Sequence, residues 1–133
     1  MAINFQRKPF PPIQFQTEPK KYQQHFLTQF REKTIVKKVE AIALFSVENE
    51  VVYLYTFTGE KFSLLKKMEY IESVCDASKF YRINRQMLVS RAAVLSFEPY
   101  VNRKIILQLK IKPTVEAIVS RLKVTRFKEW LEE

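Results

Sequence analysis

The residues AIALFSV (41–47) and VVYLYTF (51–57) decide the fold class, with the polar residues ENE (48–50) between them. Both apolar runs are short and strand-like, and the polar residues between them mark a turn. The pair Thr58-Gly59 marks a second turn, which leads into another short strand at 60–63. The 11 Phe, 6 Tyr and 1 Trp also favour strands. Together these patterns predict a mainly β fold.

After this hairpin region the spacing of apolar residues changes. Over residues 64–75 they recur every three or four positions, at Leu64, Met68, Ile71 and Cys75. That is the period of a helix with one buried face, and Ser63 precedes it as a suitable N-cap. We therefore predict one main α-helix, with Cys75 buried as a core thiol.

Strand patterns occur on both sides of this region. They predict strands at 26–30 and 34–38 before it, and at 80–83, 87–89 and 94–97 after it. A hairpin turn is expected at Asn102-Arg103. Strands followed by one helix and then further strands indicate small antiparallel sheets and exclude the βαβ core of many enzymes.

The C-terminal third alternates apolar and basic residues. From Leu107 to Ile111 every second residue is apolar, so one face is buried and the other is wet and basic. Pro113 ends that strand, and a last strand is predicted at 115–119. Ser120 then precedes a short C-terminal helix, in which the residues Val124, Phe127 and Leu131 share one face.

Residues 1–23 differ in composition from the rest of the chain. Four of the six prolines lie between residues 9 and 19, and four basic residues face one acid. Dense proline forbids regular structure, so we predict a basic, proline-rich linker or arm at 1–23. Residues 24–133 are then one domain, which suits a chain of 133 residues.

Composition also limits the chemistry that this chain can perform. With Gly59 as the only glycine, no glycine-rich phosphate loop is possible. His25 and Cys75 are the only residues of their types and cannot build a zinc site, and a lone thiol suits a reducing cytoplasm. We expect no enzyme activity, no cofactor, no metal and no membrane span.

The net charge of +9 favours an acidic partner. Three segments contain basic residues and no acid, at 79–91, 103–112 and 121–128. They lie near predicted turns or element ends, which suits contact with a polyanion. Several of their residues are arginines, whose planar guanidinium can grip phosphate or guanine with two hydrogen bonds.

Three blocks of sequence together resemble the LytTR family. They are VEAIALF (39–45) with YLYTFTG (53–59), LLKKM (64–68) with FYRINRQMLVS (80–90), and IVSRL (118–122). The resemblance covers about residues 24–131. Two positions differ from the usual pattern, because Asn84 replaces a histidine and Ser90 replaces an asparagine.

The resemblance implies a largely β domain with a single main helix, which binds duplex DNA through loops that enter successive major grooves. Family members commonly bind direct repeats in promoters. Many are the C-terminal half of a two-component response regulator, so an N-terminal receiver domain, absent from this chain, is an implied partner. The implied role is that of the output domain of a bacterial transcription regulator, and the chain is expected to be either an excised output domain or a stand-alone regulator.

The resemblance also assigns roles to individual residues. Arg121 is the first candidate for a base contact, followed by Arg85 and Asn84, while Lys79, Lys123 and Arg126 are assigned to phosphates. The turn at 48–51 matches another family contact loop, but its two acids work against that contact. For Arg82, and for Arg121 with Glu116, the alternative is an internal ion pair.

A different function from the same basic surface is RNA or single-strand binding. The aromatic residues Tyr53, Tyr55 and Phe57 could stack on bases if they were exposed. The apolar character of the run that contains them argues against that exposure. Comparing duplex with single-stranded DNA separates the two hypotheses.

Overall fold

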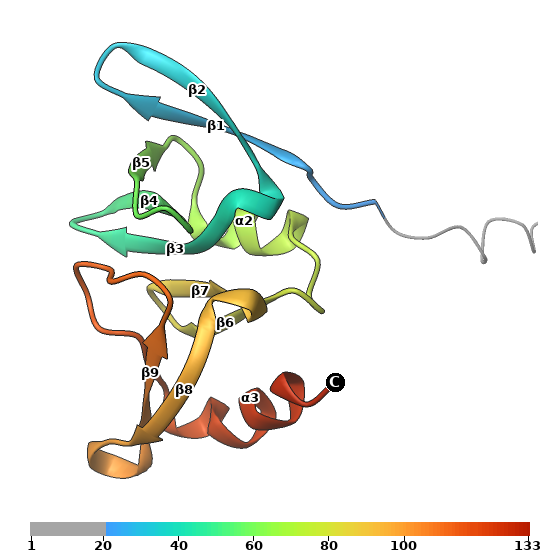
Figure 1. Cartoon of the computed structure of the whole chain (residues 1–133), viewed down its shortest axis with the longest axis vertical. Coiled ribbons are helices and arrows are strands. Elements are labelled where there is room, and N and C mark those ends of the chain that lie inside the picture. Colours follow the sequence, from blue (N-terminus) through green and yellow to red (C-terminus); the bar gives the residue numbers. More distant parts are fainter. Residues whose placement is uncertain (1–20) are drawn as a thin grey trace, which may run out of the picture.

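The structure is a computed structural model that describes residues 21–133 (Figure 1). It confirms a mainly β fold of antiparallel sheets with a short C-terminal helix. The strands are β1 (His25–Phe30), β2 (Lys33–Lys38), β3 (Ile42–Glu48), β4 (Val51–Thr56), β5 (Lys61–Leu64), β6 (Phe80–Asn84), β7 (Met87–Ser90), β8 (Val94–Pro99), β9 (Ile105–Leu109) and β10 (Ile118–Val119). The α-helices are α2 (Met68–Val74) and α3 (Val124–Leu131), and 3-10 turns lie at Val39–Ala41, Arg91–Ala93, Val101–Arg103 and Arg121–Lys123. Of the predicted linker, residues 1–20 lie outside the described residues.

The strands form two sheets. Seven of them make one sheet in the order β2-β1-β5-β4-β3-β7-β6, and a second sheet has the order β10-β9-β8. Figure 1 shows the β1–β2 hairpin at one end of the molecule and the β8–β9 hairpin with α3 at the other. The β1–β2 hairpin therefore forms one edge of the large sheet, and the C-terminal layer lies at the other end of that sheet, where β10 contacts β6.

The central strands are buried on both faces, which explains why their sequence is almost continuously apolar. On β3, the side chains of Ile42 and Phe45 join one core with Ile71 of α2. Ala43 and Leu44 join the other core, which includes Phe127 of α3. The pairing of β3 with β4 shifts register between Ile42 and Leu44, so two successive residues face the same core there.

Two hairpins turn through left-handed backbone. Asn49 and Glu50 have φ values of 52° and 66°, and Asn102 and Arg103 have φ values of 57° and 64°. Positive φ at both central positions matches the right-handed twist of the strands. The turns predicted at 48–50 and 102–103 are confirmed.

The start of the main helix differs from the prediction. Leu64 is the last residue of β5 and pairs with Val52, whereas α2 begins at Met68 without a side-chain cap. Leu64 misled the prediction because it is buried in the same core as Met68, so its spacing imitated a helical period. The remaining buried face is confirmed, since Met68, Ile71 and Cys75 are all buried.

The C-terminal region also differs in detail. The strand predicted at 115–119 is reduced to Ile118–Val119. The preceding segment is held toward the large sheet, because the Thr114 amide donates to the Tyr55 hydroxyl at 3.2 Å. Ser120 makes no side-chain cap. Phe127 is buried as predicted, but the other deeply buried residue of α3 is Trp130 and not Leu131.

Within residues 21–133, no helix is long and apolar enough to cross a membrane.

Candidate nucleic-acid interface

Three segments that are distant in the sequence lie next to one another at the ends of their strands: the β3–β4 turn, the β6–β7 turn and the residues that lead into α3. The Val47 amide donates to the Gln86 carbonyl at 2.8 Å, which joins the end of β3 to the β6–β7 turn. The Ser120 amide donates to the Ile83 carbonyl at 2.9 Å, which joins β6 to the entrance of α3. The β6–β7 turn is therefore flanked by the β3–β4 hairpin and by the residues that precede Arg121.

Arg85 and Arg121 lie on two of these neighbouring segments. Arg85 occupies the β6–β7 turn, and Arg121 begins the 3-10 turn before α3. Both residues are exposed, and within residues 21–133 neither guanidinium makes a hydrogen bond or ion pair. The alternative pairing of Arg121 with Glu116 does not form. Both side chains are free to contact a ligand.

The Asn84 side chain is partly committed to the protein. Its Nδ2 donates to the Ile118 carbonyl at 2.6 Å, and its Oδ1 accepts from the Gln86 amide at 2.7 Å. This leaves one N–H and one lone pair of the amide for another partner. The prediction that Asn84 contacts a base is not tested by this geometry and stays a prediction.

Arg82 is held internally, as its alternative interpretation proposed. Its side chain is only 12% exposed, and its Nη1 lies 2.8 Å from Oε1 of Glu72. A second acid of α2, Glu69, lies 3.7 Å from its Nη2. The same guanidinium donates to the carbonyls of Asn84 and Arg85. These four contacts take up its polar atoms.

The three residues assigned to phosphates have different surroundings. Lys79 is exposed, and within the described part of the chain its ammonium makes no hydrogen bond or ion pair, although its charge helps to lower the pKa of the nearby Asp76 carboxyl. Arg126 is 81% exposed and lies 3.8 Å from Glu129. The Lys123 ammonium instead donates to the Arg82 carbonyl at 3.0 Å and is partly buried. Lys79 and Arg126 are therefore more accessible to a phosphate than Lys123.

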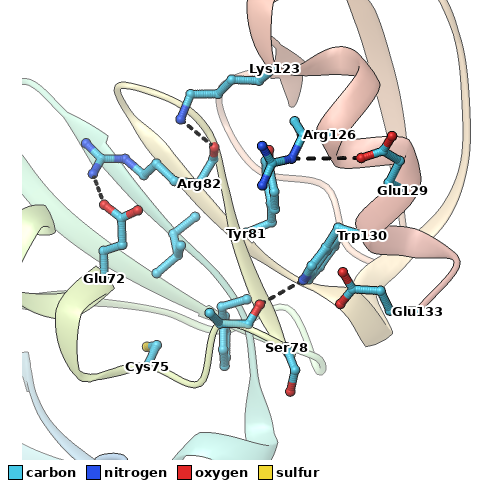
Figure 2. Close-up of a pocket in the computed structure, with 13 residues that line it drawn as sticks. Glu72, Cys75, Ser78, Tyr81, Arg82, Lys123, Arg126, Glu129, Trp130 and Glu133 are labelled. Atoms are coloured by element: carbon cyan, nitrogen blue, oxygen red, sulfur yellow. Dashed lines mark hydrogen bonds and ion pairs between the residues drawn. The ribbon is translucent and has the colours of Figure 1, made fainter.

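A groove of about 650 Å³ lies between α2, β6 and α3 (Figure 2). Its charged lining residues are Arg82, Lys123 and Arg126 on the basic side, and Glu72, Glu129 and Glu133 on the acidic side. Three acids balance three cations, so the groove as a whole does not concentrate positive charge. A polyanion is better served by the exposed arginines at the turns.

The β3–β4 turn is less acidic than its sequence suggests. Glu48 pairs with Lys61 at 2.8 Å and accepts a hydrogen bond from the Tyr55 hydroxyl at 2.7 Å. Burial alone would raise the pKa of the Glu48 carboxyl, but these bonds hold that pKa below its usual value of 4.5. Lys61 neutralises Glu48, and the other acid of this turn, Glu50, makes no ion pair within residues 21–133.

Lys67 is a candidate that the sequence analysis missed. It is exposed and lines a hollow of about 430 Å³ together with Arg85 and Glu50, between the two turns. In the helix predicted at 64–75, Lys67 lies off the face shared by Leu64, Met68 and Ile71, so the apolar spacing gave no sign that it would lie near the β6–β7 turn. Its closeness to Arg85 makes it a further candidate for a phosphate contact.

No group of three or more His, Cys, Asp or Glu residues among residues 21–133 is arranged to hold a metal ion.

The structure is a small antiparallel β domain whose turns carry exposed cations, among them Lys67, Arg85 and Arg121. The model of the LytTr DNA-binding domain matches residues 32–132, and the chain belongs to the LytTR family. This is a family of DNA-binding domains and not of enzymes.

A solved structure supports the fold independently. The chain is similar to the LytTr DNA-binding domain of a Bacillus cereus protein described as a methyl-accepting/DNA response regulator. The TM-score is 0.72 at 12% sequence identity, over 84% of this chain and 99% of that chain. At this identity the likeness establishes the fold alone. No curated protein matches the sequence.

Proposed function

We propose that this chain binds duplex DNA with sequence specificity, as the output domain of a bacterial transcription regulator. The observation that carries the proposal is the placement of Arg85 and Arg121 on neighbouring segments of a DNA-binding fold, where both are exposed and make no ion pair with any of residues 21–133. An arginine offers two parallel donors, which suit O6 and N7 of guanine in the major groove.

The remaining contacts divide by chemistry. Asn84 is the third candidate for a base, because an amide can pair with adenine through a donor and an acceptor. Lys79, Lys123 and Arg126 neutralise phosphates, which position the protein on the duplex and carry no sequence information. Lys67, beside Arg85, joins this second group.

The cellular context is proposed on the family relationship. We propose a cytoplasmic regulator, of the two-component response regulator kind, that recognises direct repeats in promoters and receives its signal from an N-terminal receiver domain. The description of the similar Bacillus cereus protein as a DNA response regulator supports this context. We also keep residues 24–133 as the proposed domain and 1–23 as its linker or arm.

Binding to RNA or to single strands is the alternative function. It needs exposed aromatic rings for stacking. Tyr55 is 4% exposed, and the side chains of Tyr53 and Phe57 pack against the core that contains it. The structure therefore offers less support for the alternative than for duplex binding.

The test compares one selected sequence as duplex, single strand and RNA, with a scrambled duplex as the control. A preferred duplex is first selected from a random pool, and affinities are then measured by fluorescence anisotropy for that duplex, a scrambled duplex, each separate strand and the matching RNA. We expect the selected duplex to bind most tightly. Equal or tighter binding to a single strand would favour the alternative function.

A further inference from the structure

Arg82 stands beside the candidate interface without facing outward. It belongs to β6, and its guanidinium donates to the Asn84 carbonyl at 3.0 Å and to the Arg85 carbonyl. Both carbonyls belong to the segment that carries the Arg85 side chain. The guanidinium of one arginine therefore holds the backbone on which another arginine is displayed.

The other end of Arg82 is anchored in α2. Glu72 lies 2.8 Å and Glu69 lies 3.7 Å from the guanidinium nitrogens. Figure 2 shows the Arg82–Glu72 pair on the side of the groove opposite α3. A planar guanidinium can bond two carbonyls and a carboxylate together, whereas an ammonium cannot span all three in this geometry.

The strand pairing next to this turn is irregular. The register of β6 with β7 shifts between Arg82 and Asn84, and beyond the shift a single pair, Asn84 with Met87, closes the turn that carries Arg85. The backbone after the irregularity is then located by the Arg82 contacts, by the Asn84 amide and by the bond between Val47 and Gln86.

We propose that Arg82 is a positioning residue for Arg85, fixing the β6–β7 turn against α2 so that the Arg85 guanidinium meets its base pair. This inference rests on the proposed function, because it assumes that Arg85 reads a base. Arg82 itself need not touch DNA, since its polar atoms are already committed to the protein.

The experiment measures base preference position by position. The preferred duplex and its set of single-base-pair substitutions are titrated with the wild type, Arg85→Ala, Arg82→Lys and the double variant Arg82→Lys/Arg85→Ala. Arg91→Lys is the matched control, because Arg91 also binds backbone carbonyls, those of Ser78 and Trp130, but away from this turn. Melting curves establish which variants are folded.

At the base pairs that depend on Arg85, we expect Arg82→Lys to lower the affinity ratio between preferred and substituted duplexes about tenfold, because a misplaced guanidinium loses its bidentate contact. Affinity for scrambled duplex stays near that of the wild type. In the double variant Arg82→Lys adds no further loss, because residues that act through one contact are not additive. Arg91→Lys leaves base preference unchanged.

Three results would overturn the proposal: full preference in Arg82→Lys, equal losses on preferred and scrambled duplex, or a loss that adds to that of Arg85→Ala. If Arg82→Lys does not fold, Glu72→Gln goes through the same cycle and decides the question, with a smaller loss expected at the same base pairs. If Arg85→Ala itself changes no preference, the proposed base contact fails first and Arg82 has nothing to position.

Discussion

Arg121 and Lys123 stand two residues apart, yet their side chains have different surroundings. The Arg121 side chain is exposed and unpaired within residues 21–133, whereas Lys123 is bonded to the Arg82 carbonyl. We therefore expect Arg121→Ala to cost about 1–3 kcal/mol of binding free energy at the preferred site and little on scrambled DNA. Anisotropy titrations on both duplexes measure the two values.

The matched control for this prediction is Lys79→Ala. Lys79 is exposed and proposed to meet a phosphate, so its loss weakens both duplexes alike. Lys123→Ala is a poorer control, because it also removes an internal hydrogen bond. A folded Arg121→Ala protein that kept its full preference for the selected site would refute the base contact.

Cys75 tests the packing of α2 on the large sheet. The thiol is 5% exposed, and burial, together with the nearby charges of Asp76 and Glu72, raises its pKa to about 12. Since the thiolate is the reactive form, we expect no rapid labelling by a thiol reagent in the native state at neutral pH. Labelling should appear in denaturant. Fast native labelling would contradict the placement of the helix.

At the scale of elements, the bond cluster of Glu48, Lys61, Tyr55 and Thr114 joins β3, β4 and β5 to the segment before β10. We expect Glu48→Gln to lower the free energy of unfolding at pH 7 by roughly 1.5–3 kcal/mol, the range for hydrogen bonds to charged groups. The folded-state pKa of Glu48 lies below 4.5. Its contribution is therefore present above that pH and is lost as the pH falls through the folded pKa.

Denaturation of wild type and Glu48→Gln between pH 7 and pH 3 measures this effect, and the two stabilities should converge at the acid end. Glu60→Gln is the control, because Glu60 also pairs with a lysine but is 54% exposed. Its effect should be small at every pH. A Glu48→Gln deficit that stayed constant down to pH 3 would show that the carboxylate charge is not what stabilises the cluster.

The sequence predicted secondary structure correctly where the spacing of apolar residues follows the burial of their side chains. Strict alternation at Leu107, Leu109 and Ile111 matches their buried side chains. It failed where a strand and a helix contribute residues to the same core. Leu64 belongs to β5, but it lies four residues before Met68, so its spacing looked like part of the helix. Trp130 was missed as an anchor because its indole is fixed by a distant partner, the Ala77 carbonyl at 2.8 Å.

The site was predictable only to the level of candidate residues. The sequence supplies the arginines of the second and third blocks, but whether each is free or paired depends on which acids lie near it in space. Glu72 pairs with Arg82 from ten residues away, whereas within residues 21–133 no acid forms an ion pair with Arg85. Lys67 lies near Arg85 only because the chain folds that way, and no local pattern in the sequence indicated it.

At the scale of the whole molecule, the net charge of +9 should dominate the salt dependence of binding. With six or more cations near phosphates, we expect a slope of roughly −5 in log affinity against log salt concentration. Titrations at a series of salt concentrations give the slope. A slope near zero would remove the electrostatic basis of the proposed interface.

The central claim is that two exposed arginines on neighbouring segments read the sequence of a duplex. Parallel selections from one random duplex pool, with the wild type and with the Arg85→Ala/Arg121→Ala double variant, test it most directly. We expect the wild-type selection to converge on a motif that contains guanines at a fixed spacing. The folded double variant should still bind DNA of any sequence but enrich no motif. Recovery of the same motif by the double variant, or no enrichment by the wild type, would contradict the account.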